Sequence, residues 1–240
     1  MATRIHRNGI ITGAAALVAS AALAACSGGG SSSASSSASA AHDVPSGKQL
    51  SGILLRAADV PKDYNEESIG AQNSGALLSA TPPKVDLGSA DCNTVLNLIN
   101  TVGQNSLGEA SYASDAFTPP SGLGEFDETL LEFHGTEATT FTNKLGAALN
   151  RCGTFQAADA SGATQSASVK VTPGPRLGDE SVGFTVKVAI GGQTMVMNGA
   201  AVRVGTAVAV IDNSQLQGQH TEIDLAALAG VLVPRIRSLH

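Results

Sequence analysis

The sequence predicts an α+β fold in which several helices pack on one side of a twisted antiparallel β-sheet, in a single domain with a cleft. Three observations predict it. Long runs in the second half of the chain alternate apolar and polar residues, as strands with one buried face do. Short glycine turns separate these runs, which is typical of antiparallel hairpins. Helical patterns lie mostly elsewhere in the chain, so strands and helices are partly segregated.

The clearest predicted strand covers residues 181–190, where Val, Phe and Ile at even positions alternate with small or polar residues. Gly191 and Gly192 predict a two-residue hairpin after it, and Gly205 predicts the next turn. The same alternation predicts further strands over residues 193–204, 206–212 and 167–171, and around residues 131–133.

Apolar residues at helical spacing predict helices at about residues 49–57, 91–102, 136–151 and 222–238. Asp91 and Thr221 are expected to cap the second and the last helix. Cys92 begins the apolar stripe of the second helix, and Cys152 ends that of the third. Antiparallel packing of these helices would bring the two cysteines together, so we expect a Cys92–Cys152 disulfide; the alternative is two buried thiols.

The N-terminal 25 residues have the pattern of a secretory signal peptide. Basic residues at positions 4–7 precede an apolar stretch over residues 10–23 that is too short to span a bilayer comfortably. Leu23-Ala24-Ala25-Cys26 resembles the bacterial lipobox. We therefore expect cleavage before Cys26 and lipidation of Cys26, with palmitate-like acyl chains holding the protein at the extracytoplasmic face of the cell membrane.

Three regions follow from these patterns. Residues 1–25 are the expected signal peptide, residues 26–48 a lipidated cysteine with a disordered Ser/Gly/Ala tether, and residues 49–240 the α+β extracellular domain. Cleavage removes two arginines and no acidic residue, so the net charge changes from −6 to −8. A chain this acidic is a poor candidate for nucleic acid binding.

Motifs for catalysis, metal binding or phosphate binding are absent from the sequence, so we expect no enzyme activity, no metal and no cofactor. The carboxylates of Glu125, Asp127, Glu128 and Glu132 are expected to form a solvent-exposed acidic face. A lower-ranked alternative is a hydrolase that uses carboxylates such as Asp127 and Asp179.

Several short stretches carry a family resemblance: Leu54 to Pro61, Asp91-Cys92, Arg151 to Phe155, Leu177 to Ser181, and Val202 to Gly205 before a Val-rich strand. Together they resemble the actinobacterial PknH-like extracellular domain, which occurs on sensor serine/threonine kinases and on stand-alone lipoproteins. The resemblance covers about residues 50–240. It implies an α+β fold with a cleft for an unidentified ligand. The kinase version has two disulfides, whereas this domain has cysteines for one.

A non-catalytic ligand-binding or sensing module is the function that this resemblance favours. It implies a small or amphiphilic envelope ligand and a membrane signalling partner, because the chain itself has no kinase domain. The alternative is a carrier of lipid or glycolipid, which would need a large apolar cavity. Arg203, Asp179 and Glu180 are the candidate ligand-binding residues; for Arg203 the structural alternative is an ion pair at the sheet edge.

Overall fold

The structure is a computed structural model that describes residues 44–73, 89–100, 108–122, 124–158, 164–219 and 222–240. These residues form four helices: α1 (Gly47–Ile53), α2 (Ala90–Asn100), α3 (Glu137–Cys152) and α4 (Leu225–Arg237). None of the helices in these ranges is long and apolar enough to cross a membrane.

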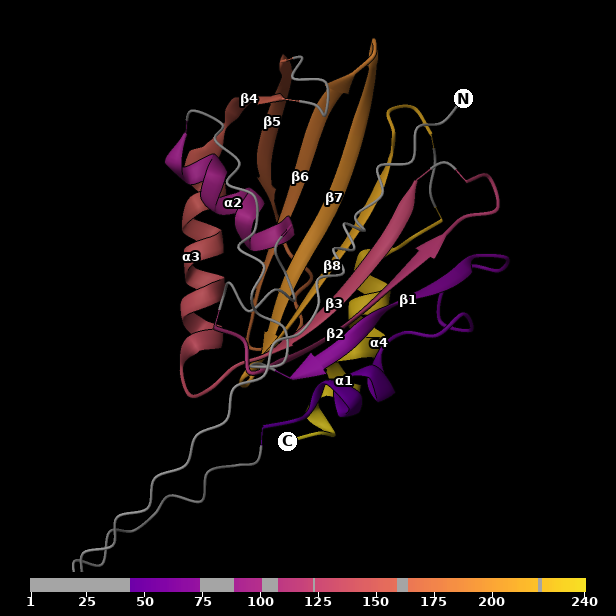
Figure 1. The fold of residues 1–240 in the computed structure, drawn as a ribbon, viewed down its shortest axis with the longest axis vertical. Coiled ribbons are helices and arrows are strands. Elements are labelled where there is room, and N and C mark those ends of the chain that lie inside the picture. Colours follow the sequence, from indigo (N-terminus) through magenta and orange to yellow (C-terminus); the bar gives the residue numbers. More distant parts are fainter. Residues whose placement is uncertain (1–43, 74–88, 101–107, 123, 159–163, 220–221) are drawn as a thin grey trace, which may run out of the picture. The chain divides into compact units, whose positions relative to one another are not determined.

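Eight antiparallel strands form one sheet beside these helices (Figure 1). They are β1 (Asn65–Asn73), β2 (Ser111–Thr118), β3 (Glu125–Glu132), β4 (Thr154–Ala158), β5 (Thr164–Thr172), β6 (Glu180–Ile190), β7 (Gln193–Val204) and β8 (Ala207–Leu216). The order across the sheet is β1-β2-β3-β8-β7-β6-β5-β4. The predicted α+β class with an antiparallel sheet is confirmed.

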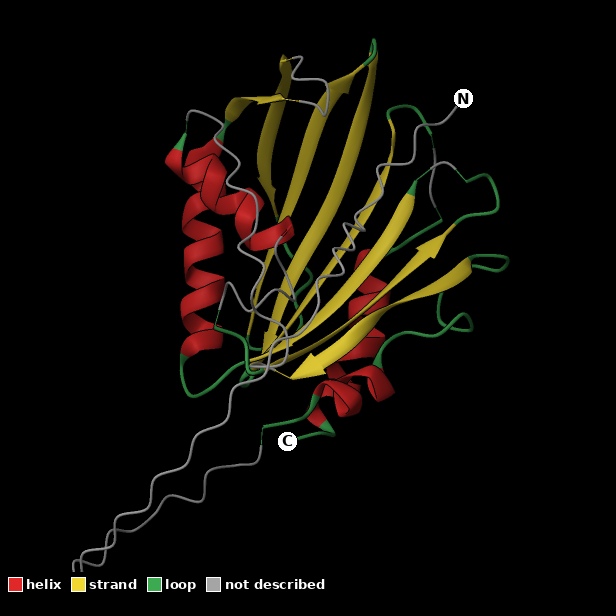
Figure 2. Cartoon of the chain, viewed as in Figure 1, coloured by secondary structure: helices red, strands yellow, loops and turns green. Residues whose placement is uncertain are grey.

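The helices cover both faces of the sheet, and the expectation that they share one side is wrong (Figure 2). Helices α2 and α3 pack on a face that includes Ala201 and Val208, which we call the α3 face. Helices α1 and α4 pack on the opposite face, the α4 face, which includes Ala200 and Val202. Because consecutive residues of β7 are apolar and point to opposite faces, this central strand needs a cover on each side.

Two helix starts differ from the prediction because side chains outside the apolar stripe determine them. Helix α1 begins at Gly47, with Ser46 and Gln49 forming a capping box. In α2 the Ser89 hydroxyl accepts a hydrogen bond from the Cys92 N–H at 3.3 Å. Asp91 therefore lies inside the first turn of α2 and does not cap it.

Helix α4 begins three residues later than predicted. Oδ1 of Asp224 accepts hydrogen bonds from the N–H groups of Ala226 at 2.9 Å and Ala227 at 3.1 Å, so Asp224 is the N-cap. The cap expected at Thr221, and Val102 at the predicted end of the second helix, lie outside the described residues.

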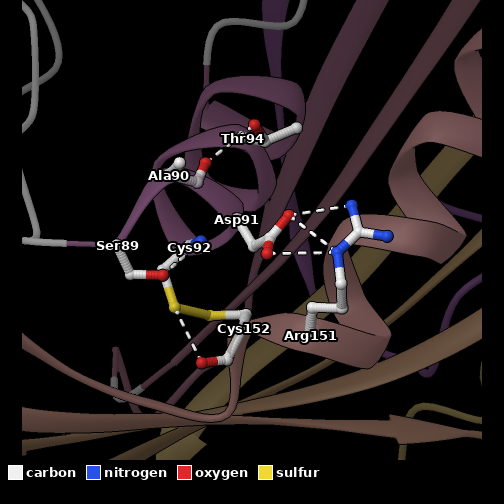
Figure 3. Close-up of a disulfide and its surroundings, with 7 residues drawn as sticks. All are labelled: Ser89, Ala90, Asp91, Cys92, Thr94, Arg151 and Cys152. Atoms are coloured by element: carbon white, nitrogen blue, oxygen red, sulfur yellow. Dashed lines mark hydrogen bonds and ion pairs between the residues drawn. A yellow bond between two sulfur atoms is a disulfide. The ribbon is translucent and has the colours of Figure 1, made fainter.

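The Cys92–Cys152 disulfide is confirmed (Figure 3). It joins the first turn of α2 to the end of α3, with the two Cα atoms 4.5 Å apart. Beside it, Arg151 of α3 makes a forked contact with the Asp91 carboxylate, with Nη2 of Arg151 2.9 Å from Oδ1 of Asp91. A covalent bond and an ion pair thus connect the same two helices.

Candidate functional site

A pocket of about 440 Å³ lies between the start of α4 and the α4 face of strands β5–β8. Its polar lining consists of Thr172, Thr185, Asn198, Asn213 and Asp224. Phe184, Ile223 and Leu225 are among the apolar residues that line it. Its volume lies within the range of pockets that hold small molecules, about 300–1,000 Å³.

Three polar side chains form a row across the floor of this pocket. Thr185 of β6 is the cross-strand partner of Asn198 of β7, which in turn is the partner of Asn213 of β8. The Thr185 hydroxyl donates a hydrogen bond of 2.8 Å to Oδ1 of Asn198. Asn213 is buried. The row therefore presents hydroxyl and amide groups to the pocket from three adjacent strands.

One feature holds the helix that borders the site, and another packs behind the strands that form it. Asp224 caps α4 through Oδ1, which holds the first turn of the helix against the pocket. On the far side of the strands that line the pocket, the α3 face, Gly199 lies beside the ring of Phe184, and a Cβ atom at Gly199 would overlap that ring. A side chain at position 199 would therefore displace Phe184 from its buried position.

Neutral hydrogen-bonding groups dominate the chemistry of the pocket. The hydroxyl and amide side chains can donate to or accept from a polar ligand. Asp224 is the carboxylate among the lining residues, and its Oδ1 atom already accepts two hydrogen bonds. Across the described part of the chain, no three His, Cys, Asp or Glu side chains gather as a metal site requires.

Arg203, Asp179 and Glu180, the ligand-binding candidates from the sequence, lie together. Nη1 of Arg203 is 3.3 Å from Oδ2 of Asp179, and its Nε is 3.4 Å from Oε2 of Glu180. The same Glu180 oxygen accepts a 2.7 Å hydrogen bond from the Thr142 hydroxyl of α3. Oδ2 of Asp179 accepts a 2.7 Å hydrogen bond from the N–H of Gly205. This cluster therefore links α3 to the start of β6 and the adjoining end of β7.

The cluster and the pocket lie on opposite faces of the sheet. Arg203 and Asn198 occupy odd and even positions of β7, and odd positions face α3. None of the three candidate residues lines the pocket. Ligand binding by Arg203, Asp179 and Glu180 stays a prediction.

The prediction that Glu128 and Glu132 belong to a solvent-exposed acidic face is wrong, because both side chains are fully buried on the α4 face. Burial raises the pKa of Glu128 from its usual 4.5 to about 8. The hydrogen bond from the Leu55 N–H lowers this pKa, but its effect is smaller than that of burial. Burial also raises the pKa of Glu132. Glu125 and Asp127 point to the other face and are partly exposed.

Glu128 lies next to the segment that joins α1 to β1. Its Oε2 atom accepts a 2.9 Å hydrogen bond from the N–H of Leu55. Arg235 of α4 donates to the carbonyl oxygen of Leu54 at 2.9 Å and pairs with Asp59 at 2.9 Å. The stretch from Leu54 to Pro61, noted above for its resemblance, is thus held by polar contacts to β3 and α4.

The polar row of the pocket was missed in the sequence, although a signal for it exists. The turns at 191–192 and 205–206 determine which residues of β6, β7 and β8 pair. Counting residues outward from each turn along the two strands that it joins pairs Thr185 with Asn198 and Asn198 with Asn213. Asparagine is also uncommon within strands, so two of them in register were a sign of a polar site.

No protein-family model and no curated protein sequence matches the chain. Among solved structures, the extracellular domain of PknH from Mycobacterium tuberculosis is similar in fold, with a TM-score of 0.59 and 13% sequence identity over 82% of this chain and 99% of that one. A putative uncharacterized protein from Mycobacterium smegmatis (Rv0999 ortholog) is aligned with a TM-score of 0.45 and 12% identity over 80% of this chain and 95% of that one. The similarity to the PknH domain shows that the chain has a PknH-like extracellular-domain fold.

Proposed function

We propose that this protein is a lipid-anchored, extracytoplasmic module that binds a small ligand without transforming it and reports its presence to a membrane signalling partner. Cys26 would carry the lipid, and the residues between Cys26 and the Ser46 cap of α1 would separate the folded domain from the membrane. The fold shared with the extracellular domain of PknH supports a sensing role. A partner is part of this proposal because the described domain carries no kinase fold of its own.

The single observation that carries the binding role is the pocket with its row of Thr185, Asn198 and Asn213. Neutral donors and acceptors on three rigid strands suit the orientation of a polar molecule. They do not supply the pair of nucleophile and base that hydrolysis would need. The mixed polar lining also favours a small ligand over the lipid or glycolipid cargo of a carrier, which would call for an apolar cavity.

Native mass spectrometry of the full chain, purified from the membranes of its own cells, tests this role. Ala226 lines the pocket at the first turn of α4, and its exposed neighbour Ala227 does not. Ala226→Trp should fill the pocket and remove a copurified small-molecule mass, whereas Ala227→Trp should retain it. An unmodified protein without any bound mass, or equal retention by both variants, would contradict the proposal.

A further inference from the structure

None of the described helices covers the α4 face of strands β4–β6 beyond the pocket. The core that α1 and α4 form on this face includes residues of β7 and β8 but none of β5 or β6. On this side the strands β4–β6 present exposed Gln156, Ser166, Lys170 and Lys187. We call the following residues on this side of β4–β7 the open strand face: Thr154, Gln156, Ser166, Ser168, Lys170, Thr172, Thr185, Lys187, Thr194, Val196 and Asn198.

The charge of this surface is opposite to that of the chain. The open strand face contains two lysines and no carboxylate, in a protein of net charge −6. Lys170 is the cross-strand partner of Thr185, and Lys187 is the partner of Ser168 and Val196. The two ammonium groups therefore project from adjacent strands at diagonal positions. Neither lysine has a carboxylate partner among the described residues.

Apart from Val196, the remaining side chains of this surface are hydroxyl and amide groups. They extend without interruption into the pocket, because Thr172, Thr185 and Asn198 belong to both. Such groups pair well with the hydroxyls of a sugar ring, and the ammonium groups would pair with carboxylate or sulfate substituents. The pocket would hold one unit of a chain that continues along the strands.

Other anionic partners fit this surface less well. Nucleic acid binding draws on many cationic contacts and on aromatic stacking, whereas the open strand face has two lysines and no aromatic residue. Anionic lipid surfaces are bound by basic residues together with large apolar side chains, and Val196 is the largest apolar side chain on this face.

Resting on the proposed function, we infer that the small group bound in the pocket is one sugar unit of an anionic, hydroxyl-rich polysaccharide, whose neighbouring units lie along the open strand face. Lys170 and Lys187 would provide the charge recognition. Thr185 and Asn198 would bind the unit in the pocket through its hydroxyls.

Binding of the full chain to three polymers of matched length tests this inference by titration calorimetry. Polygalacturonate carries both carboxylates and ring hydroxyls, dextran carries hydroxyls alone, and poly-glutamate carries carboxylates alone. Polygalacturonate should bind at least about tenfold more tightly than either of the others. The double variant Lys170→Gln/Lys187→Gln should lose about tenfold in that affinity.

The matched control is Lys48→Gln/Lys144→Gln, which removes two exposed lysines elsewhere in the domain and should leave the affinity unchanged. Equal binding of poly-glutamate, equal binding of dextran, or equal losses in the two double variants would each overturn the inference. A copurified mass that is lost in Ala226→Trp, together with no binding of polygalacturonate, would overturn the polysaccharide inference and leave the proposed function intact.

Discussion

Glu128 of β3 accepts a 2.9 Å hydrogen bond from the backbone N–H of Leu55, 73 residues earlier in the chain. This hydrogen bond holds the segment between α1 and β1 against strand β3. Its acceptor is a carboxyl group that is fully buried. Below its raised pKa this group is neutral, which avoids the cost of an ionised carboxylate in the core.

Glu128 should make the stability of the domain depend on pH. Between its usual pKa of 4.5 and its folded-state pKa of about 8, Glu128 is protonated in the folded chain and ionised in the unfolded chain. The folded state then binds more protons, so the free energy of unfolding should fall with rising pH, by about 1.4 kcal/mol per pH unit from this group. Glu128→Gln should remove this contribution.

Urea unfolding at pH 5, 6, 7 and 8 would measure the effect as a difference between variants. The control Glu222→Gln changes an exposed glutamate and should keep the slope of the unmodified protein. If Glu128→Gln kept that slope too, Glu128 would not be the titrating group.

The Cys92–Cys152 bond should contribute a large share of the domain's stability. It closes a loop with a sequence separation of 60 residues. In the chain-entropy model such a loop contributes roughly 4 kcal/mol by restricting the unfolded chain. Cys92→Ala/Cys152→Ala should lower the free energy of unfolding in urea by that order. Reductant should destabilise the unmodified protein and leave the double variant unchanged; equal sensitivity of the two would contradict the prediction.

Arg203 should matter more for stability than Arg151, although each forms an ion pair. The Arg203 side chain is 18% exposed and contacts two carboxylates, whereas that of Arg151 is 61% exposed. Arg203→Ala should cost about 1–3 kcal/mol and Arg151→Ala less than about 1 kcal/mol in urea unfolding.

The same variants test whether Arg203 also binds ligand. If its role is purely to link the ends of β6 and β7 to α3, Arg203→Ala should retain the copurified mass while lowering the melting temperature. Loss of the mass from a still-folded Arg203→Ala protein would instead assign Arg203 to the ligand.

Cys26 should determine where the protein is found in the cell. With two acyl chains on Cys26, the unmodified protein should incorporate labelled palmitate and partition into the detergent phase of a Triton X-114 extract. Cys26→Ser should do neither. Cys92→Ala/Cys152→Ala serves as a control and should remain in the detergent phase. Palmitate label in the Cys26→Ser protein would contradict the assignment of the anchor.

The second half of the sheet was predictable because local signals define it. The alternation of apolar and polar residues in β6, the glycines in the turn after β6 and the glycine in the turn after β7 predicted the positions of both strands correctly. Strand β2 was missed because buried Ser111 and Asp115 replace apolar residues on its inner face and hide the alternation. Strands β1 and β4 were missed as well; they form the two edges of the sheet.

Features that depend on contacts between distant segments were harder to predict. The apolar pair Ala200 and Ala201 indicates that both faces of β7 are covered, but not which helix covers each face. Burial of Glu128 depends on the packing of Leu55 over β3, and the pocket depends on where α4 begins. Alternation alone describes one strand at a time and contains none of this information.

A crystal structure of the protein purified from its own cell envelope would show most directly whether a ligand occupies the pocket. We expect density for a small molecule or a sugar unit in the pocket, within hydrogen-bonding distance of Thr185 and Asn198. A pocket that contains only water, or a copurified molecule bound elsewhere on the domain, would contradict this expectation.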